Sequence, residues 1–210
     1  RCEVLRLSRL EGEDASAVVG EEFTVLAADG VTDLWGVMYR PENFDPRRKY
    51  PVIDHLYGGP QVAMVHRGSG NGDTHQRLDR ALAQLGYIVI SLDARGTPER
   101  SKAFHDTVYR SWGRHEIPDH AAAIEQLAQR HSFIDLDRVG VWGHSWGGYF
   151  AIRALIQAPH IFRAAVAAAP ATDPYDSILY EPYLDLPTRA KAAYDYARLA
   201  PSAGKIEGRL

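Results

Sequence analysis

The sequence predicts an α/β protein with a mostly parallel sheet and helices on both faces. From residue 51 onward, short apolar runs typical of strands alternate with segments of helical spacing. The runs at 87–92 and 139–142 are apolar enough for strands that are buried on both faces. Strands joined through helices run parallel, because a parallel connection needs a long crossover.

The N-terminal part is expected to be β-rich. Residues 1–20 are polar and irregular and indicate a lead-in or linker. Turn residues at Asp29-Gly30 and in the segment 41–49 separate the runs that follow. The expected strands lie at 22–27, 32–39 and 51–57.

Helices and buried strands alternate through the rest of the chain. In the segment 73–85, Leu78, Leu82 and Leu85 share one face, and Gly86 follows as a helix C-cap would. Pro118 occupies a first-turn position, where its missing N–H costs nothing. The remaining expected elements are strand 87–92, helix 118–129, strand 139–142, helix 147–157, strand 164–169 and a helix-like segment at 189–199.

Composition is ordinary for a globular domain. The 210 residues carry 24 basic and 27 acidic side chains, a net charge of −3, and 45% are hydrophobic. This balance argues against a nucleic-acid partner. The longest apolar runs, such as 164–170, are too short to cross a bilayer. Cys2 is the only cysteine, which leaves no intrachain disulfide and no cysteine-based metal site.

Ser145 stands in the run Gly143-His144-Ser145-Trp146-Gly147-Gly148, between a predicted strand and a predicted helix. This is the Gly-x-Ser-x-Gly elbow in the context that its chemistry needs. A strained backbone at Ser145 would point the hydroxyl out of the turn, and side chains at positions 143 and 147 would collide with the neighbouring strand and helix. The Trp146 N–H, at a helix start, would stabilise an oxyanion. The elbow predicts an α/β-hydrolase fold with Ser145 as nucleophile; the alternative is a glycine-rich turn with an incidental serine.

Tyr57 is the second candidate. It opens the run Tyr57-Gly58-Gly59-Pro60 after the strand at 51–57. In α/β-hydrolases the loop after the third strand supplies the other oxyanion donor, usually a backbone N–H. A phenolic O–H can donate in the same way. The alternative is an ordinary Gly-Gly-Pro turn with a half-buried tyrosine.

Four motifs together resemble the prolyl oligopeptidase family, and its dipeptidyl peptidase IV branch most. They are the run 56–60, the run 93–97, the elbow through Tyr149, and Tyr175-Asp176-Ser177 with Tyr183 and Leu186-Pro187. The resemblance covers roughly residues 20–187. It implies that residues 21–210 are part of a C-terminally truncated hydrolase domain, and that residues 1–20 lead in from a missing N-terminal propeller.

The resemblance also implies roles and a function. Ser145 would be the nucleophile, Tyr57 and the Trp146 N–H the oxyanion hole, and Trp146, Tyr175 and Tyr180 an apolar pocket for a proline-like ring. The implied enzyme is a serine peptidase that works through an acyl-enzyme and cleaves after proline or alanine to release N-terminal dipeptides. Its partner would be a peptide substrate, with no cofactor, metal, nucleic acid or membrane contact. The complete protein, of which this chain would be a part, would be a homodimer that is periplasmic or secreted.

The sequence departs from the family pattern at two points. Leu179 stands where the family usually has a tyrosine, and Tyr180 lies one place further on. Pro174 also interrupts the preceding segment. These departures concern the lining of the pocket.

The acid and the base of the triad are expected beyond Leu210, because in this fold they follow the serine in the chain. His160 is the sole later histidine, and it follows the helix that leaves the elbow, so it should lie at the far end of the sheet. Asp173 is a weak candidate for the acid. His144 should point away from its neighbour Ser145, and all other histidines should lie away from this end of the sheet. The chain alone is therefore expected to be inactive; a serine esterase on the same fold is the other open alternative.

Two further runs are expected to be structural. In His115-Glu116-Ile117-Pro118-Asp119-His120 the histidines are five apart and a proline intervenes, which does not fit a helical metal motif. The run 68–72 is glycine-rich but lacks the Lys and Ser/Thr of a phosphate loop, so it predicts a flexible loop.

Overall fold

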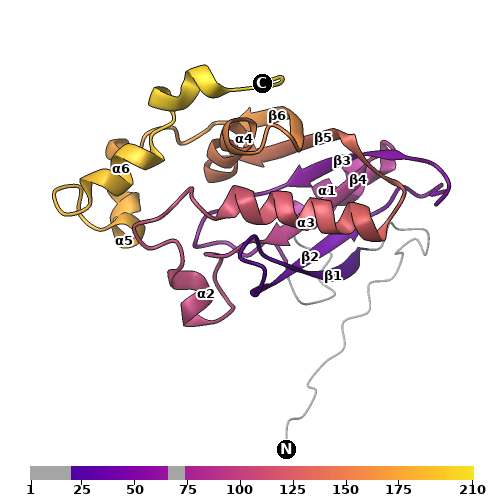
Figure 1. The fold of residues 1–210 in the computed structure, drawn as a ribbon, viewed down its shortest axis with the longest axis horizontal. Helices are drawn as coiled ribbons and strands as arrows, with labels where there is room; N and C mark the ends of the chain where they lie inside the picture. The colour runs from indigo at the N-terminus through magenta and orange to yellow at the C-terminus, as the bar shows by residue number, and fades with distance from the viewer. Residues whose placement is uncertain (1–19, 66–73) are drawn as a thin grey trace, which may run out of the picture.

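A six-stranded sheet organises the chain (Figure 1). The computed structural model describes residues 20–65 and 74–210. The strand order is β1-β2-β4-β3-β5-β6, with β1 and β2 antiparallel and the other four parallel. This confirms the predicted mostly parallel sheet. The strands are β1 Glu21–Leu26, β2 Asp33–Tyr39, β3 Tyr50–His55, β4 Ile88–Asp93, β5 Ile134–His144 and β6 Phe162–Ala168.

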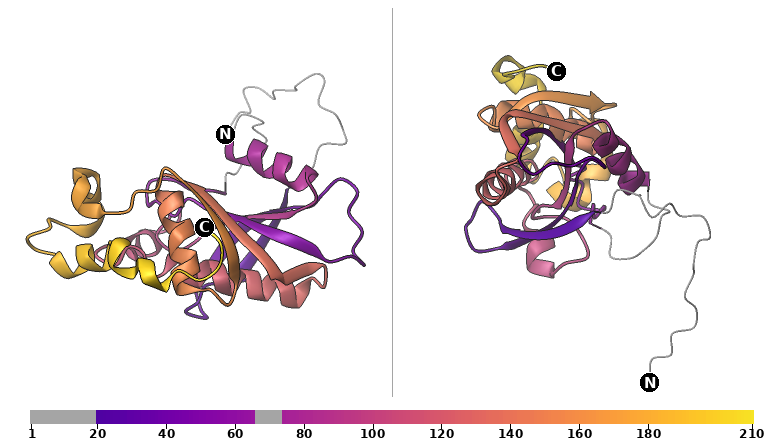
Figure 2. Two further views of the ribbon diagram at one scale, coloured as in Figure 1. Left: turned by 90° about the horizontal axis from the view of Figure 1, so that it is seen from above. Right: turned by 90° about the vertical axis from the view of Figure 1, so that its right-hand side faces the viewer.

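Helices cover both faces of the sheet. Helix α1 lies on one face, and α3 and α4 lie on the other (Figure 2). Strand β4 is buried at every position, as expected for a strand between two helical layers. The α-helices are α1 Thr74–Gln84, α2 Lys102–Asp106, α3 Glu116–Arg130, α4 Trp146–Gln157, α5 Glu181–Leu184 and α6 Lys191–Ala197, with 3-10 turns at Pro174–Asp176, Ile178–Tyr180 and Ala200–Lys205.

Most expected elements are shifted by one or two residues at their ends, and strand β5 and helix α2 differ more. Strand β5 begins at Ile134, five residues early, because its first half is polar and half exposed and so lacks the apolar pattern. Helix α3 begins at Glu116, which still leaves Pro118 in its first turn. Helix α2 was not predicted; five residues carry no periodicity, and a side-chain cap from Ser101 to the Phe104 N–H starts it. The expectations for residues 1–19 and 68–72 lie outside the described residues.

Two buried His–Asp pairs brace strand β3. Asp54 and His55 are neighbours on the strand, so their side chains face opposite sides of the sheet. Asp54 Oδ2 lies 2.8 Å from Nδ1 of His120 on α3, and His55 Nδ1 lies 2.5 Å from Oδ1 of Asp79 on α1. Ser91 on β4 donates to the second oxygen of Asp79. The carboxyl end of β3 is thereby tied to a helix on each face.

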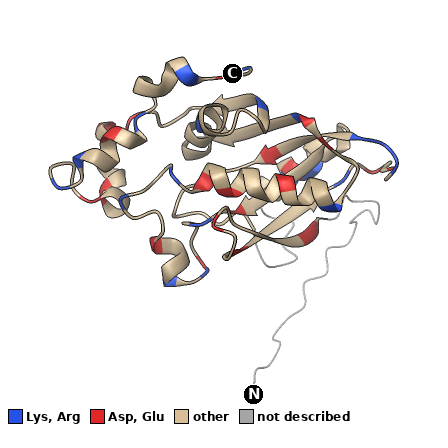
Figure 3. Cartoon of the chain, viewed as in Figure 1, with Lys and Arg blue, Asp and Glu red and all other residues tan. Residues whose placement is uncertain are grey.

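The surface carries charges of both signs. Figure 3 shows Lys, Arg, Asp and Glu interspersed over the helices, strands and loops of the described chain. Within residues 20–65 and 74–210, no helix is both long and apolar enough to cross a membrane.

Candidate active site

Ser145 occupies a strained turn between β5 and α4. Its φ is +59° and its ψ is −114°, a backbone conformation that non-glycine residues rarely adopt. The Ser145 N–H donates to Ala168 O at 2.8 Å, and the Ser145 carbonyl accepts from the N–H groups of Tyr149 at 3.1 Å and Ala171 at 3.3 Å. The end of β6 and the first turn of α4 therefore hold the serine in place. Such strain persists where the surroundings fix it, and it recurs at active sites.

The glycines around Ser145 are required by close backbone contacts. A Cβ on Gly143 would lie 2.3 Å from Gly147 O, and a Cβ on Gly147 would lie 2.4 Å from Leu56 O. A Cβ on Gly148 would lie 2.7 Å from Ala168 O. These neighbours are backbone atoms that cannot move aside, which confirms the expected collisions. The elbow consequently packs directly against the end of β3, where Tyr57 follows.

Tyr57 and the elbow lie at the same edge of the sheet, since β3 and β5 are parallel neighbours. Gly58 has φ +67°, and a Cβ there would lie 2.3 Å from the Phe150 ring of α4. A Cβ on Gly59 would lie 2.8 Å from the Trp146 ring. The loop thus lies on side chains of the helix that Ser145 begins. Tyr57 itself is half-buried, and its Oη accepts a hydrogen bond from Gln61 Nε2 at 3.2 Å.

Trp146 is the first residue of α4. Its N–H is one of the amides at a helix start that have no intrahelical acceptor. Partial positive charge gathers at that end of the helix. The backbone beside Ser145 is therefore suited to bind an oxygen that gains negative charge.

The Trp146 ring lies in an aromatic cluster. It stacks on Tyr180 with ring centroids 5.1 Å apart and meets Tyr183 edge-on at 5.6 Å. Trp112, which the sequence analysis missed, lies 5.3 Å from Trp146 and stacks on Tyr149 at 4.1 Å. Burial raises the pKa of Tyr180 to about 12, so this hydroxyl stays protonated.

Tyr175 lies apart from this cluster in its contacts. Its ring packs against Tyr194 at 4.9 Å, and its hydroxyl donates to Asp195 at 3.0 Å. The side chain is 42% exposed. Of the three residues expected to line the pocket, the structure brings Trp146 and Tyr180 together and gives Tyr175 different neighbours.

The histidine and aspartate weighed as triad partners are placed elsewhere. His160 is exposed beyond the far end of α4, with Glu125 at 3.9 Å. Asp173 accepts from Arg198 Nε at 2.8 Å and from the Tyr175 N–H. Asp173 is therefore engaged in other contacts, and His160 lies away from Ser145.

One expectation about the histidines was wrong. His105 does not lie away from the carboxyl edge of the sheet, since its Nε2 is 2.8 Å from Pro60 O, in the loop that Tyr57 opens. The reason is α2, which follows β4 and was not predicted. His144 is exposed beside Ser145.

The cluster before and within α3 serves the fold. His120 pairs with Asp54; burial lowers the pKa of His120, but the carboxylate outweighs burial and the net direction is upward. Glu116 accepts from the N–H groups of Gly113 and His115. Burial raises the pKa of Glu116 to about 7. The side chains of Glu116 and His120 are therefore engaged in contacts within the fold.

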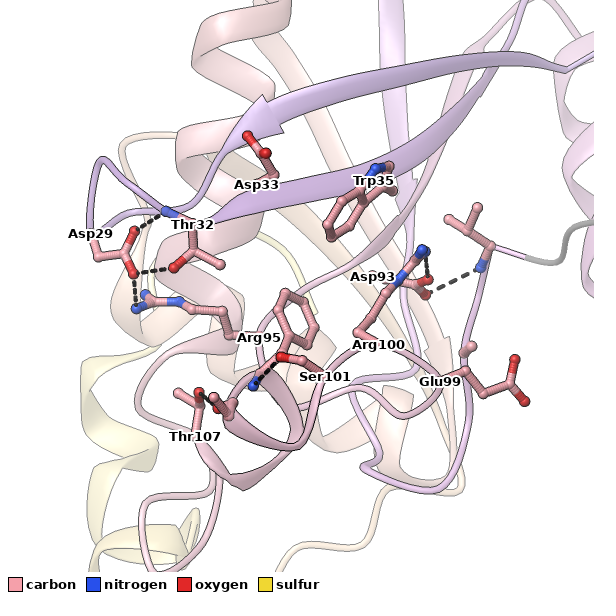
Figure 4. A pocket seen from close by; sticks show the side chains of 14 residues that line it. Asp29, Thr32, Asp33, Trp35, Asp93, Arg95, Glu99, Arg100, Ser101 and Thr107 are labelled. Carbon is pink, nitrogen blue, oxygen red and sulfur yellow. Dashed lines mark hydrogen bonds and ion pairs between the residues drawn. The ribbon is translucent and has the colours of Figure 1, made fainter.

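A cavity of about 770 Å³ lies at the ends of β2 and β4 (Figure 4). Trp35, Asp93 and Arg100 line it, together with Ala63 and Val65 from the continuation of the Tyr57 loop. Asp93 accepts from the Val65 N–H at 3.1 Å and pairs with Arg100. The end of β4 therefore holds the far end of the Tyr57 loop.

A strained serine on a strand–helix turn of this sheet defines an α/β-hydrolase. More narrowly, the chain belongs to the prolyl oligopeptidase family, whose family model matches residues 76–205. It is 39% identical to human dipeptidyl peptidase 8 over 188 residues, which are 89% of this chain and 21% of that protein.

Solved structures agree with this membership. A Bacteroides ovatus protein assigned as a dipeptidyl aminopeptidase IV matches with a TM-score of 0.83 and 36% identity, over 91% of this chain and 27% of that one. Porphyromonas gingivalis dipeptidyl peptidase 4 matches with a TM-score of 0.80 and 29% identity, over the same shares. The chain thus spans about a fifth of the curated relative and about a quarter of the solved chains.

Proposed function

We propose that this chain carries the nucleophile and oxyanion hole of a serine dipeptidyl peptidase. The observation that carries the proposal is the positive φ of Ser145 in an elbow packed against the Tyr57 loop. Family membership supports the same reading, and so do the dipeptidyl peptidases among the relatives.

In the proposed reaction, Ser145 Oγ attacks the carbonyl carbon of the scissile peptide bond. The serine proton passes to a base, and the carbonyl oxygen becomes an oxyanion that accepts from the Trp146 N–H and the Tyr57 O–H. The C–N bond then breaks, the amine leaves with the proton, and an acyl-enzyme remains. Water attacks the acyl-enzyme, which releases the acid product and returns the proton to Ser145.

The base and the acid belong, in this proposal, to residues outside this chain. His160 and Asp173 are engaged or distant, and His144 sits on the turn itself. His105 binds a backbone carbonyl of the Tyr57 loop. Among the described residues, no hydrogen bond joins any of these groups to the Ser145 side chain, so we propose that a histidine from sequence outside this chain is the base.

We place the residue before the scissile bond against Trp146 and Tyr180. The two aromatic rings form an apolar surface, which suits a compact ring such as proline, or the methyl group of alanine, without hydrogen bonds. Residues 21–210 would then be part of the catalytic domain of a longer homodimeric protein, with residues 1–20 leading in from a preceding domain.

The test is substrate profiling of the complete protein. We expect release of Gly-Pro and Ala-Pro from chromogenic substrates with a free N-terminus, and loss of that activity in Ser145→Ala. The same substrates with a blocked N-terminus should not be cleaved. Cleavage of blocked peptides would indicate an endopeptidase, and turnover of simple esters alone would indicate an esterase.

A further inference from the structure

We propose that His105 is a positioning residue for the Tyr57–Pro60 loop, acting through the hydrogen bond between its Nε2 and the Pro60 carbonyl at 2.8 Å. The inference rests on the proposed function, since this loop carries the proposed oxyanion donor Tyr57. His105 does not touch the reacting atoms; it acts on the backbone three residues after Tyr57.

Pro60 has one backbone group that can be anchored. Proline lacks an N–H, so its carbonyl is its only polar backbone atom. Pro60 is buried, and a buried carbonyl left without a hydrogen-bond partner is destabilising. The imidazole of His105 supplies that partner from a segment 45 residues away.

The loop is fixed before and after Pro60 by other contacts. Before it, the Leu56 N–H donates to Trp142 O at 3.0 Å. After it, the Met64 and Val65 N–H groups donate to Asp93 Oδ1 at 2.7 and 3.1 Å. Between these two ends, among the described residues, His105 provides the side-chain hydrogen bond to the loop backbone. Its loss would leave Pro60 O without this partner, while both ends of the loop and the turn bond from the Val62 N–H to Gly59 O at 3.1 Å stay in place.

His105 lies on helix α2, which several contacts hold in place. The Ser101 side chain caps α2 by accepting from the Phe104 N–H at 3.1 Å, and the Gly96 N–H donates to Phe104 O at 2.9 Å. Phe104 is buried and lies 6.3 Å from the Trp35 ring. The imidazole is thus tied to the ends of β2 and β4, which belong to the rigid sheet.

The expected consequence is catalytic rather than a matter of affinity. An oxyanion donor is effective because it is held where charge develops, and a small displacement weakens the transition state more than the bound substrate. A carbonyl accepts, so Nε2 must carry the proton. Glutamine can present an N–H at a similar reach, whereas leucine fills the space without a donor.

The experiment measures kcat and KM of the complete protein with a Gly-Pro chromogenic substrate. His105→Leu and His105→Gln are each made in the wild type and in Tyr57→Phe. We expect His105→Leu to lower kcat about tenfold with KM within about twofold, and His105→Gln to restore most of kcat. In the Tyr57→Phe background, His105→Leu should have little further effect, because it acts through Tyr57.

An unchanged kcat in His105→Leu, or an equal loss in both backgrounds, would overturn the positioning role. Failure of His105→Gln to restore kcat would do the same. A Tyr57→Phe variant with wild-type kcat would overturn the proposed oxyanion hole and this inference with it. Should His105→Leu fail to fold, His105→Asn replaces it, since its amide is too short to reach Pro60.

Discussion

The role proposed for Tyr57 depends on where its hydroxyl proton points. Gln61 Nε2 donates to Tyr57 Oη, so the oxygen is an acceptor in that contact. A phenol can accept and donate at once, so its own proton stays available. The contact also polarises the O–H bond, because linked hydrogen bonds strengthen one another. Gln61 therefore favours Tyr57 as a donor to an oxyanion.

Tyr57→Phe removes that proton and keeps the ring. We expect kcat of the complete protein to fall by on the order of 10²–10³-fold with little change in KM, because the lost interaction forms mainly in the transition state. Steady-state kinetics measure this. Tyr109→Phe, at an exposed tyrosine, is the matched control. If Tyr57→Phe and Tyr109→Phe had the same kinetics, Tyr57 would contribute to packing and not to oxyanion binding.

Features of single residues could be predicted from the sequence where neighbouring residues in the chain determine them. The strain at Ser145 and the need for Gly143 and Gly147 could be predicted because six contiguous residues encode the turn. The contact of His105 with Pro60 could not, because it joins distant segments through a helix without a periodic pattern. The packing of Tyr175 on Tyr194 likewise depends on how α6 packs against the 3-10 turn Pro174–Asp176.

At the scale of elements, the junction of β3, β5 and α4 leaves no room for added atoms. Gly147→Ala would place a Cβ 2.4 Å from Leu56 O and 3.2 Å from Tyr57 Cα. We expect this variant to lose at least about a hundredfold in kcat and to be destabilised by roughly 1–3 kcal/mol, since backbone must shift on both sides. Activity and thermal unfolding of the complete protein measure both effects.

Gly204→Ala is the control for that substitution. A Cβ at Gly204 would have no heavy atom within 4 Å. Its stability should stay within about 0.5 kcal/mol of wild type. A Gly147→Ala variant as active and stable as Gly204→Ala would show that the elbow is looser than its contacts indicate.

The start of α3 holds a carboxyl group with an unusual affinity for protons. Glu116 is 2% exposed, and burial raises its pKa from 4.5 to about 7. Between these two values the folded chain keeps the proton while the unfolded chain releases it. The contribution of Glu116 to folding stability therefore falls as pH rises through this window, and that contribution is lost above about pH 7.

Glu116→Gln should remove this pH dependence, because glutamine does not titrate. Relative to the variant, wild type should lose roughly 3 kcal/mol of unfolding free energy between pH 4.5 and 7. Urea denaturation of both proteins at pH 5, 6, 7 and 8 gives the difference. Parallel stability curves for the two proteins would show that Glu116 titrates normally.

Element boundaries were predictable only where hydrophobic pattern marks them. Strand β4 and helix α4 lie close to their expected positions because they are apolar nearly throughout. The first half of β5 contains Asp135, Asp137 and Arg138, and it joins the sheet through the pairing of Ile134 with Tyr50 before the ladder resumes at Val139. Its inclusion is set by neighbouring strands rather than by its own sequence.

At the scale of the whole molecule, the sheet brings the proposed site together at the carboxyl ends of its parallel strands. Tyr57 follows β3 and Ser145 follows β5, and these strands are neighbours. The His120–Asp54 and His55–Asp79 pairs fix β3 to the helices on both faces. The loop that begins at Tyr57 thus extends from a strand that is paired with a helix on each face of the sheet.

We expect the 210-residue chain expressed alone to be essentially inactive. A serine hydroxyl is a weak nucleophile without an adjacent base. His105 is hydrogen-bonded to Pro60 O, and His160 lies near Glu125. Neither histidine is bonded to Ser145. Assay of a Gly-Pro chromogenic substrate at matched concentrations compares the chain with the complete protein. Turnover within about tenfold of the complete protein would mean that a base lies within these residues.

Covalent labelling tests the central claim, that Ser145 is the nucleophile, most directly. A fluorophosphonate phosphonylates an activated serine with loss of fluoride, and mass spectrometry of the digested protein locates the modified residue. The account predicts a single phosphonylated site at Ser145 in the complete protein and no labelling of the Ser145→Ala variant. Labelling at another serine, or labelling that persists in Ser145→Ala, would contradict it.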